Sequence, residues 1–159
     1  MNQGKSTVVA ANDLVGTTLY TEALAGCTAC AVRVPLADGG QFLALTHYWA
    51  IAQDENVVRL RGMINTLDRP LHPLKRPFLL ILEPKQYGDG LQLLPPGSST
   101  FSQQLSQGVS DALQGRLDTH FEPYSPGSSS TLDQGTLVAG VDSKGEAFWQ
   151  TWFSAGKLE

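Results

Sequence analysis

The chain has 159 residues, of which 42% are hydrophobic and 16% are charged. This length suits one domain with a substantial core, and this composition excludes a wholly disordered chain. The formal net charge of −4 offers neither the basic surface that nucleic acid requires nor an attraction to anionic lipid. We therefore expect no nucleic-acid partner and no membrane partner, and the longest apolar runs, such as residues 78–82, are too short to cross a bilayer.

The two ends of the chain raise separate questions. The first residues, MNQGKSTVVAAND, lack the charged start and long apolar region of a signal peptide. The last two residues, Leu158 and Glu159, are interpreted as a cloning scar outside the fold. We therefore expect residues 1–157 to form a single domain.

The first half of the chain predicts three strands and a helix. Short stretches rich in β-branched and aromatic residues predict the strands at residues 17–23, 30–34 and 42–48. The turn sequence Asp38-Gly39-Gly40 joins the last two strands into a predicted β-hairpin. Residues 56–67 place apolar side chains at helical spacing and predict a helix.

The second half predicts a helix between further strands. A buried strand is expected at residues 77–82, and a helix at residues 102–117 with Ser102 as its N-cap. A short strand at residues 119–124 precedes a second hairpin, whose strands are expected at residues 135–142 and 146–153. This order predicts a mixed α+β fold, with a β-sandwich or mixed sheet core flanked by two or more helices.

Cys27 and Cys30 lie three residues apart, and His47 follows on the predicted hairpin. The two cysteines can be core residues, a redox pair or two ligands of a zinc site. Alternatively, one of them can be a nucleophile. A redox Cys-x-x-Cys pair normally begins a helix, but a strand-like sequence follows Cys30. A zinc ion would need His47 and a fourth ligand, and neither His72 nor His120 has a nearby partner in the sequence.

The nucleophile interpretation assigns a role to each residue around Cys27. Gly26 permits a tight turn, so that the backbone N–H groups of Gly26 and Cys27 can form an oxyanion hole. The hairpin returns His47 toward the beginning of the strand that follows Cys27, where a base must lie. Thr21, six residues before Cys27, is a candidate for holding the other ring nitrogen of His47. Cys30 points to the same strand face as residues 32 and 34 and is expected in the core.

Leu24-Ala25-Gly26-Cys27 resembles the Leu-x-Gly-Cys signature of the glutamine deamidases related to the catalytic domain of cytotoxic necrotizing factor. This group includes the Burkholderia lethal factor toxin and the chemoreceptor deamidase CheD. In both of these, a threonine precedes the cysteine by six residues, as Thr21 does here, and a histidine follows on the next strand, as His47 does. The resemblance covers about residues 17–49. The chain lacks the Gly-Gly pattern that CheD carries downstream of its histidine, which favours the toxin branch.

The resemblance implies hydrolysis of a protein glutamine side chain to glutamate and ammonia, through a thioester on Cys27. It implies a Cys27, His47 and Thr21 triad, no metal or organic cofactor, and the fold of the group. It further implies a bacterial toxin or effector, secreted or delivered into the host cytoplasm, acting on a small GTPase or a translation factor. A CheD-like chain would instead act on a chemoreceptor in the bacterial cytoplasm. Transglutamination shares the thioester and stays open.

A protein substrate requires contact residues around the nucleophile. Aromatic side chains on loops at the same end of the fold are the candidates, and we expect Tyr48, Trp49 and Tyr87 to bind substrate. The alternative to an enzyme is a non-catalytic protein-interaction domain in which Cys27 and His47 are structural. A reactive thiol distinguishes the two interpretations.

Overall fold

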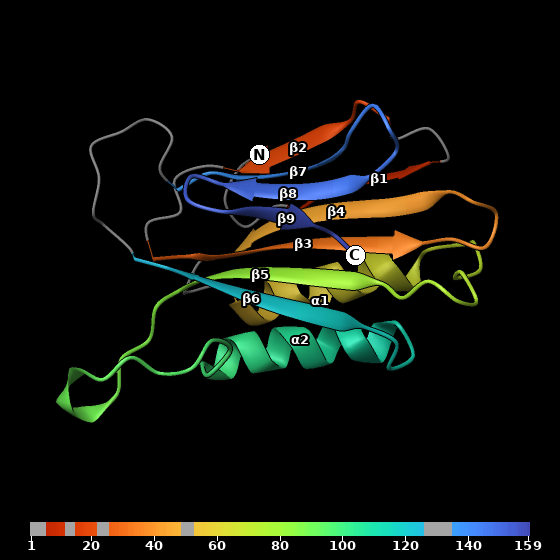
Figure 1. Cartoon of the computed structure of the whole chain (residues 1–159). Helices are drawn as coiled ribbons and strands as arrows, with labels where there is room; N and C mark the ends of the chain where they lie inside the picture. The colour runs from red at the N-terminus through yellow and green to blue at the C-terminus, as the bar shows by residue number, and fades with distance from the viewer. Residues whose placement is uncertain (1–5, 12–14, 22–25, 49–52, 126–134) are drawn as a thin grey trace.

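The described part of the chain forms two β-sheets and a layer of helices (Figure 1). The computed structural model describes residues 6–11, 15–21, 26–48, 53–125 and 135–159. In these residues, a five-stranded sheet has the order β1-β4-β3-β5-β6 and a four-stranded sheet has the order β2-β7-β8-β9. One face of the larger sheet packs against the smaller sheet, and the helices cover its other face (Figure 1). The predicted mixed α+β fold is confirmed.

The larger sheet is built around the predicted hairpin of β3 (Thr28–Pro35) and β4 (Gln41–Tyr48), which pair in antiparallel register. Gly39 has a φ of 87° in the connecting turn, and the Gly40 N–H donates to the Asp38 carboxylate at 2.8 Å. The remaining strands are β1 (Ser6–Ala11) beside β4, β5 (Phe78–Pro84) beside β3, and β6 (Asp118–Tyr124) parallel to β5. The sequence did not predict β1.

The smaller sheet joins distant parts of the chain. Its strands are β2 (Thr18–Thr21), β7 (Leu137–Val141), β8 (Ala147–Thr151) and β9 (Ala155–Lys157). The predicted hairpin of β7 and β8 is confirmed, and β2 pairs antiparallel with β7. Leu158, expected to lie outside the fold, is fully buried in the core between the sheets, and its N–H donates to the Ala147 carbonyl at 3.1 Å.

Strand alternation divides the core into two halves. Ala29 and Ala31 of β3 face the smaller sheet, whereas Cys30 and Val32 face the helices. All four are fully buried. Both faces of the central strand β3 are therefore buried at these positions, which explains why its sequence is a nearly continuous apolar run.

Helix α1 (Gln53–Asn65) begins three residues earlier than predicted, and α2 (Thr100–Ala112) ends five residues earlier. The N-cap of α2 is Ser99, whose hydroxyl accepts the Ser102 N–H at 3.1 Å, so the expected Ser102 cap is wrong. Gln114 and Gly115 follow α2 with positive φ angles of 61° and 76°, which a helix cannot continue through. A short 3₁₀ helix, η1 (Asp89–Leu91), lies between β5 and α2.

The helices that the structure describes are short. Among the described residues, none is long and apolar enough to traverse a lipid bilayer. Instead, α1 and α2 lie side by side on the larger sheet, where buried apolar residues of both helices enter one core (Figure 1).

Candidate active site

Strand register brings Cys27 and His47 to one face of the larger sheet. His47 is the penultimate residue of β4 and lies directly opposite Ala29 of β3. Cys27 precedes β3 by one residue and packs against the core between the sheets, the same core that Ala29 enters. His47 therefore lies at the end of the hairpin where the chain passes from Cys27 into β3, on the same face of the sheet.

Thr21 reaches the same place from the smaller sheet. It is the last residue of β2, and its hydroxyl lies 2.8 Å from Nδ1 of His47 in a hydrogen bond. Both side chains are buried, with Thr21 0% and His47 1% exposed. The structure thus joins the two residues that the sequence proposed as base and orienting partner, through a contact between sheets.

The second ring nitrogen of His47, Nε2, is buried. Among the residues that the structure describes, none forms a hydrogen bond with it. Burial lowers the pKa of His47 to about 4, because the charged imidazolium loses its hydration. At neutral pH His47 is therefore an uncharged imidazole that retains the capacity to accept a proton.

The thiol of Cys27 is also neutral. Burial raises its pKa above the ordinary value, and Cys27 is a free, partly buried cysteine. The pKa directions of Cys27 and His47 together favour a thiol beside an imidazole over the expected thiolate–imidazolium pair. A reaction at Cys27 would then need His47 to remove the proton as the sulfur attacks.

The expected oxyanion hole is changed by a tyrosine. The Gly26 N–H donates to the hydroxyl of Tyr124 at 2.9 Å, and that hydroxyl donates to the Cys27 carbonyl at 2.6 Å. The Gly26 N–H is thus occupied, and the Cys27 N–H is the remaining donor of the expected pair. Gly26 itself has a φ of 96°, which explains the glycine at this position.

Cys30 lies on the other face of β3. It is fully buried, its sulfur lies 2.8 Å from the Thr46 hydroxyl, and burial raises its pKa to about 11. The expectation that Cys30 belongs to the core is confirmed. Because Cys27 contacts the core on the opposite side of the sheet, the two thiols do not share a site.

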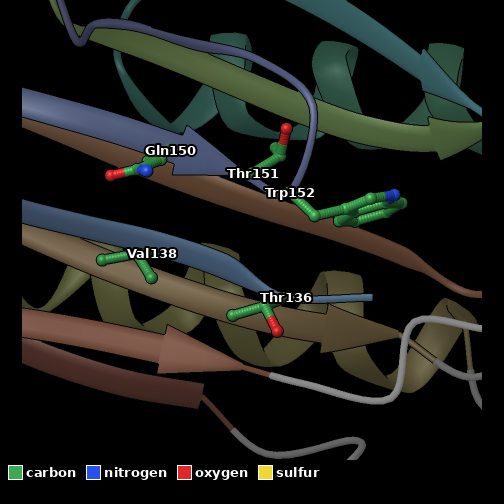
Figure 2. A pocket seen from close by; sticks show the side chains of 5 residues that line it. All are labelled: Thr136, Val138, Gln150, Thr151 and Trp152. Carbon is green, nitrogen blue, oxygen red and sulfur yellow. The ribbon is translucent and has the colours of Figure 1, made fainter. Parts of the chain in front are cut away.

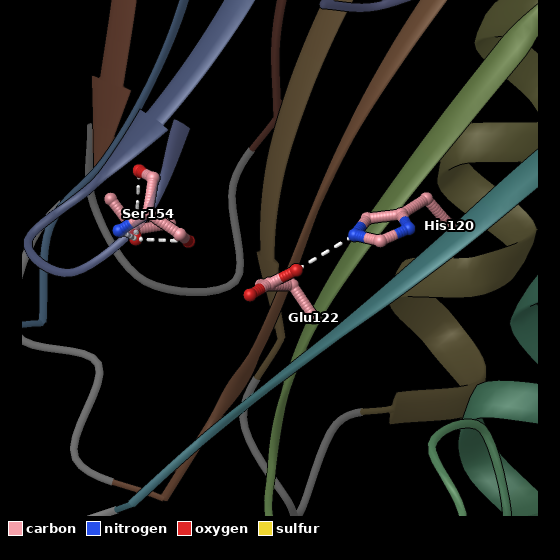
Figure 3. A network of polar contacts seen from close by, with 4 residues as sticks. His120, Glu122 and Ser154 are labelled. Carbon is pink, nitrogen blue, oxygen red and sulfur yellow. Dashed lines mark hydrogen bonds and ion pairs between the residues drawn. The ribbon is translucent and has the colours of Figure 1, made fainter. Parts of the chain in front are cut away.

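The other histidines have partners of their own. Nδ1 of His72 accepts the N–H groups of Leu74 and Lys75. Nε2 of His120 lies 2.7 Å from the carboxylate of Glu122, and both residues belong to β6 (Figure 3). The hydrogen bonds of Ser154, drawn in the same figure, form a separate group. In the part of the chain that the structure describes, no three metal-binding side chains form a cluster.

The three expected substrate-binding residues have different outcomes. Tyr48 is fully buried under the helices, where its ring contacts Phe101 edge-on, so it cannot contact a substrate. Trp49 lies outside the described residues. Tyr87 is 56% exposed, on a segment of residues 85–97 that projects beyond the end of the sheets where β3 begins (Figure 1).

A pocket of about 330 Å³ opens at the end of the smaller sheet (Figure 2). It is lined by Thr136, Val138, Gln150, Thr151 and Trp152, none of them charged. Leu137 pairs with both Thr21 and Thr151, which places the pocket close to the residue that holds His47. The Trp152 ring also contacts Tyr124, with ring centroids 5.4 Å apart.

Comparison with known proteins does not assign the chain to a family. No family model and no curated protein matches the chain by sequence. The features of this chain that bear on its function are therefore the arrangement of Thr21, Cys27, Tyr124 and His47 and the resemblance around the cysteine.

The buried imidazole makes stability depend on pH. Unfolding returns His47 to its ordinary pKa of 6.5, so below that pH the unfolded chain binds a proton that the folded protein does not bind. The free energy of unfolding is therefore unaffected by His47 above about pH 6.5 and decreases as the pH drops toward 4. We expect a loss of about 3 kcal/mol from this one group.

Urea denaturation at several pH values checks this expectation. Between about pH 7 and about pH 4, the free energy of unfolding of the wild type should fall about 3 kcal/mol further than that of His47→Gln. The glutamine variant removes the titrating group while keeping a polar side chain. Parallel curves for the two proteins would show that His47 is not a buried neutral imidazole.

Proposed function

We propose that this chain is a cysteine-dependent protein-glutamine deamidase, with Cys27 as nucleophile, His47 as base and Thr21 as the residue that orients His47. The observation that supports this most is the buried hydrogen bond between the Thr21 hydroxyl and Nδ1 of His47, with no partner for Nε2 among the described residues. In the tautomer that a base requires, the Nδ1–H group donates to the Thr21 hydroxyl and Nε2 is free to accept a proton. A structural histidine normally satisfies both ring nitrogens, because an unpaired buried polar atom costs about 1–3 kcal/mol. An unpaired Nε2 beside a cysteine suits a proton acceptor.

The acylation step follows from these positions. Sγ of Cys27 attacks the carbon of a glutamine side-chain amide while Nε2 of His47 takes the thiol proton. The amide oxygen becomes negative and accepts the Cys27 N–H, an interaction worth about 3–4 kcal/mol in comparable sites. His47 then gives its proton to the amide nitrogen, the C–N bond breaks, ammonia leaves, and a thioester joins Cys27 to the substrate.

The deacylation step reuses the same base. His47, neutral again, takes a proton from a water molecule as its oxygen attacks the thioester carbon. The C–S bond breaks, Cys27 recovers its proton from His47, and the product is a glutamate side chain. An amine in place of water would give transglutamination through the same thioester.

The substrate under this proposal is a folded protein. The projecting segment of residues 85–97 exposes Tyr87, Leu91 and Leu93 to 56%, 85% and 57% at the end of the fold that carries Cys27. Exposed apolar side chains on a projecting loop suit contact with a protein surface. The resemblance favours a bacterial toxin or effector acting on a host small GTPase or translation factor over a chemoreceptor deamidase.

One observation favours the non-catalytic alternative. Burial raises the pKa of Cys27 and lowers that of His47, and no hydrogen bond joins Nε2 to the sulfur. An interaction domain with two structural side chains would have these properties as well. A direct search for product distinguishes the alternatives.

Deamidation in cell extracts tests the proposal. We expect wild-type protein added to a eukaryotic extract to convert a specific glutamine to glutamate, detected by peptide mass spectrometry, and Cys27→Ala to leave that peptide unchanged. Cys30→Ala is the matched control and should retain most activity, because Cys30 lies on the other face of the sheet. Conversion in a bacterial extract only would favour the chemoreceptor branch.

Identical peptide sets with wild type and Cys27→Ala in both extracts would overturn the deamidase proposal. Equal loss of activity in Cys30→Ala and Cys27→Ala would overturn the assignment of the nucleophile. The folded state of each variant is checked by circular dichroism, because replacing the buried Cys30 removes its contact with Thr46.

A further inference from the structure

Tyr124 forms a bridge across the backbone on both sides of the candidate nucleophile. Its hydroxyl accepts the Gly26 N–H at 2.9 Å and donates to the Cys27 carbonyl at 2.6 Å. The residue comes from the end of β6, about a hundred positions further along the chain, and its side chain is 2% exposed. We call these two hydrogen bonds the Tyr124 bridge.

We propose that Tyr124 is a positioning residue that fixes the peptide group between Gly26 and Cys27, and with it the direction of the Cys27 N–H and side chain. This inference rests on the proposed function of Cys27 as a nucleophile. The bridge holds the donor before this peptide and the acceptor after it. The bridge therefore fixes the two peptide groups on either side, which limits the arrangements open to the peptide between Gly26 and Cys27.

The turn at Gly26 needs such a restraint. Gly26 has a φ of 96° and is exposed, and no described residue beyond its chain neighbours lies within 4 Å of the position that a Cβ would occupy. Glycine in open space has the widest backbone freedom of any residue. Without the bridge, the Cys27 N–H could point in many directions, whereas an oxyanion donor must point in one.

The tyrosine is itself held firmly. Its ring contacts the Trp152 ring edge-on at a centroid distance of 5.4 Å, and its main-chain carbonyl accepts the Lys85 N–H at 2.8 Å. Burial raises the pKa of its hydroxyl to about 12, so the group stays protonated and keeps both bonds at neutral pH. The hydroxyl uses its proton in the bond to the Cys27 carbonyl and accepts the Gly26 N–H, so it suits a positioning role rather than proton transfer.

Site-resolved alkylation tests the inference without a known substrate. Iodoacetamide is reacted with wild type, Tyr124→Phe, His47→Gln and the control Tyr48→Phe over a range from about pH 6 to about pH 10, and Cys27 is followed by mass spectrometry. Tyr48→Phe is a matched control because it removes a buried tyrosine hydroxyl on the other face of the sheet. Tyr124→Phe keeps the ring against Trp152 and removes only the bridge.

At neutral pH we expect Cys27 of wild type and Tyr48→Phe to react alike, with His47 as the base, and His47→Gln to react slowly. Tyr124→Phe should lose reactivity about 10-fold, toward the rate of His47→Gln, because a displaced thiol no longer meets the base. Above the thiol pKa the sulfur ionises without His47, so the rates of all four proteins should converge. That pH profile separates alignment from general disturbance of the fold.

The possible outcomes distinguish a failure of the Tyr124 positioning role from a failure of the proposed function. If Tyr124→Phe matches wild type while His47→Gln is slow, the positioning role is overturned and the proposed function stands. If Tyr124→Phe is slower at every pH, including the alkaline end, access and not alignment has changed, which also overturns it. If wild type and His47→Gln coincide, His47 does not assist the thiol, and the proposed function falls together with the role of Tyr124.

A measurement on the wild type keeps the inference testable if Tyr124→Phe does not fold. Gly26 is exposed, so its amide hydrogen should be protected from exchange only through the Tyr124 hydroxyl. Slow exchange of the Gly26 amide, measured by nuclear magnetic resonance, is the expected result. Exchange at the rate of a free peptide would show that the bridge is absent in solution and would overturn the proposal.

Discussion

Deamidation is expected to fall by at least about 10⁴-fold when either Cys27 is replaced by serine or His47 by glutamine. A serine hydroxyl is a much weaker acid than a thiol, so transfer of its proton to His47 during the attack is far less favourable. In His47→Gln, the Cys27 thiol keeps a raised pKa and has no base near its sulfur. Each change therefore stops acylation at its first step.

Rates of glutamate formation on a substrate protein, followed by mass spectrometry, measure this effect. The double variant should be no slower than either single variant, because nucleophile and base act as one unit. His120→Gln is the control for loss of a histidine, since His120 is exposed on β6 and paired with Glu122. Losses that multiply in the double variant would show that Cys27 and His47 act separately.

Local sequence patterns were sufficient to predict the two hairpins, but they did not predict the pairing partner of every strand. Asp38-Gly39-Gly40 determined the β3–β4 turn, because its conformation needs a glycine at positive φ. The edge strands β1 and β9 escaped prediction, because pairing with a neighbour defines them more than their own composition does. The parallel pairing of β5 with β6, on either side of α2, leaves no local signal at all.

Two residues of the proposed triad, Cys27 and His47, could be brought together from the sequence because the hairpin fixes their spacing and strand direction. The β3–β4 hairpin alone returns His47 to the level of Ala29, next to Cys27. The error at Tyr48 has a simple cause, since consecutive residues of a strand face opposite sides. If His47 faces Cys27, then Tyr48 must face the helices, as it does. Alternation applied one residue further would have excluded it.

Tyr124 illustrates what one sequence cannot show. Its strand was predicted, but the distance along the chain to Gly26 gives no indication that its hydroxyl reaches that turn. The contact exists because β6 runs parallel to β5 and ends where β3 begins. The site is therefore assembled at one end of both sheets, from β2, β3, β4 and β6, and only the β3–β4 part is local in sequence.

Loss of the Thr21 hydroxyl is the second change for which we expect a large decrease in activity. Replacing Thr21 by valine should lower kcat about 100-fold, because valine has the same shape but cannot bond Nδ1 of His47. The imidazole would then lose the partner that fixes its tautomer and its rotation, and the fraction of His47 with Nε2 ready to accept a proton would fall. Thr21→Ser keeps the hydroxyl and should retain most of the activity.

Separate measurements of kcat and KM distinguish orientation from substrate binding. Thr21 is 0% exposed, so KM should be nearly unchanged in both variants, and the loss should lie in kcat. Valine also leaves Nδ1 buried without a partner, which should cost about 1–3 kcal/mol of unfolding free energy. A Thr21→Val protein that is destabilised by this amount but fully active would show that the hydrogen bond serves the fold alone, and His47 would then need no orienting residue.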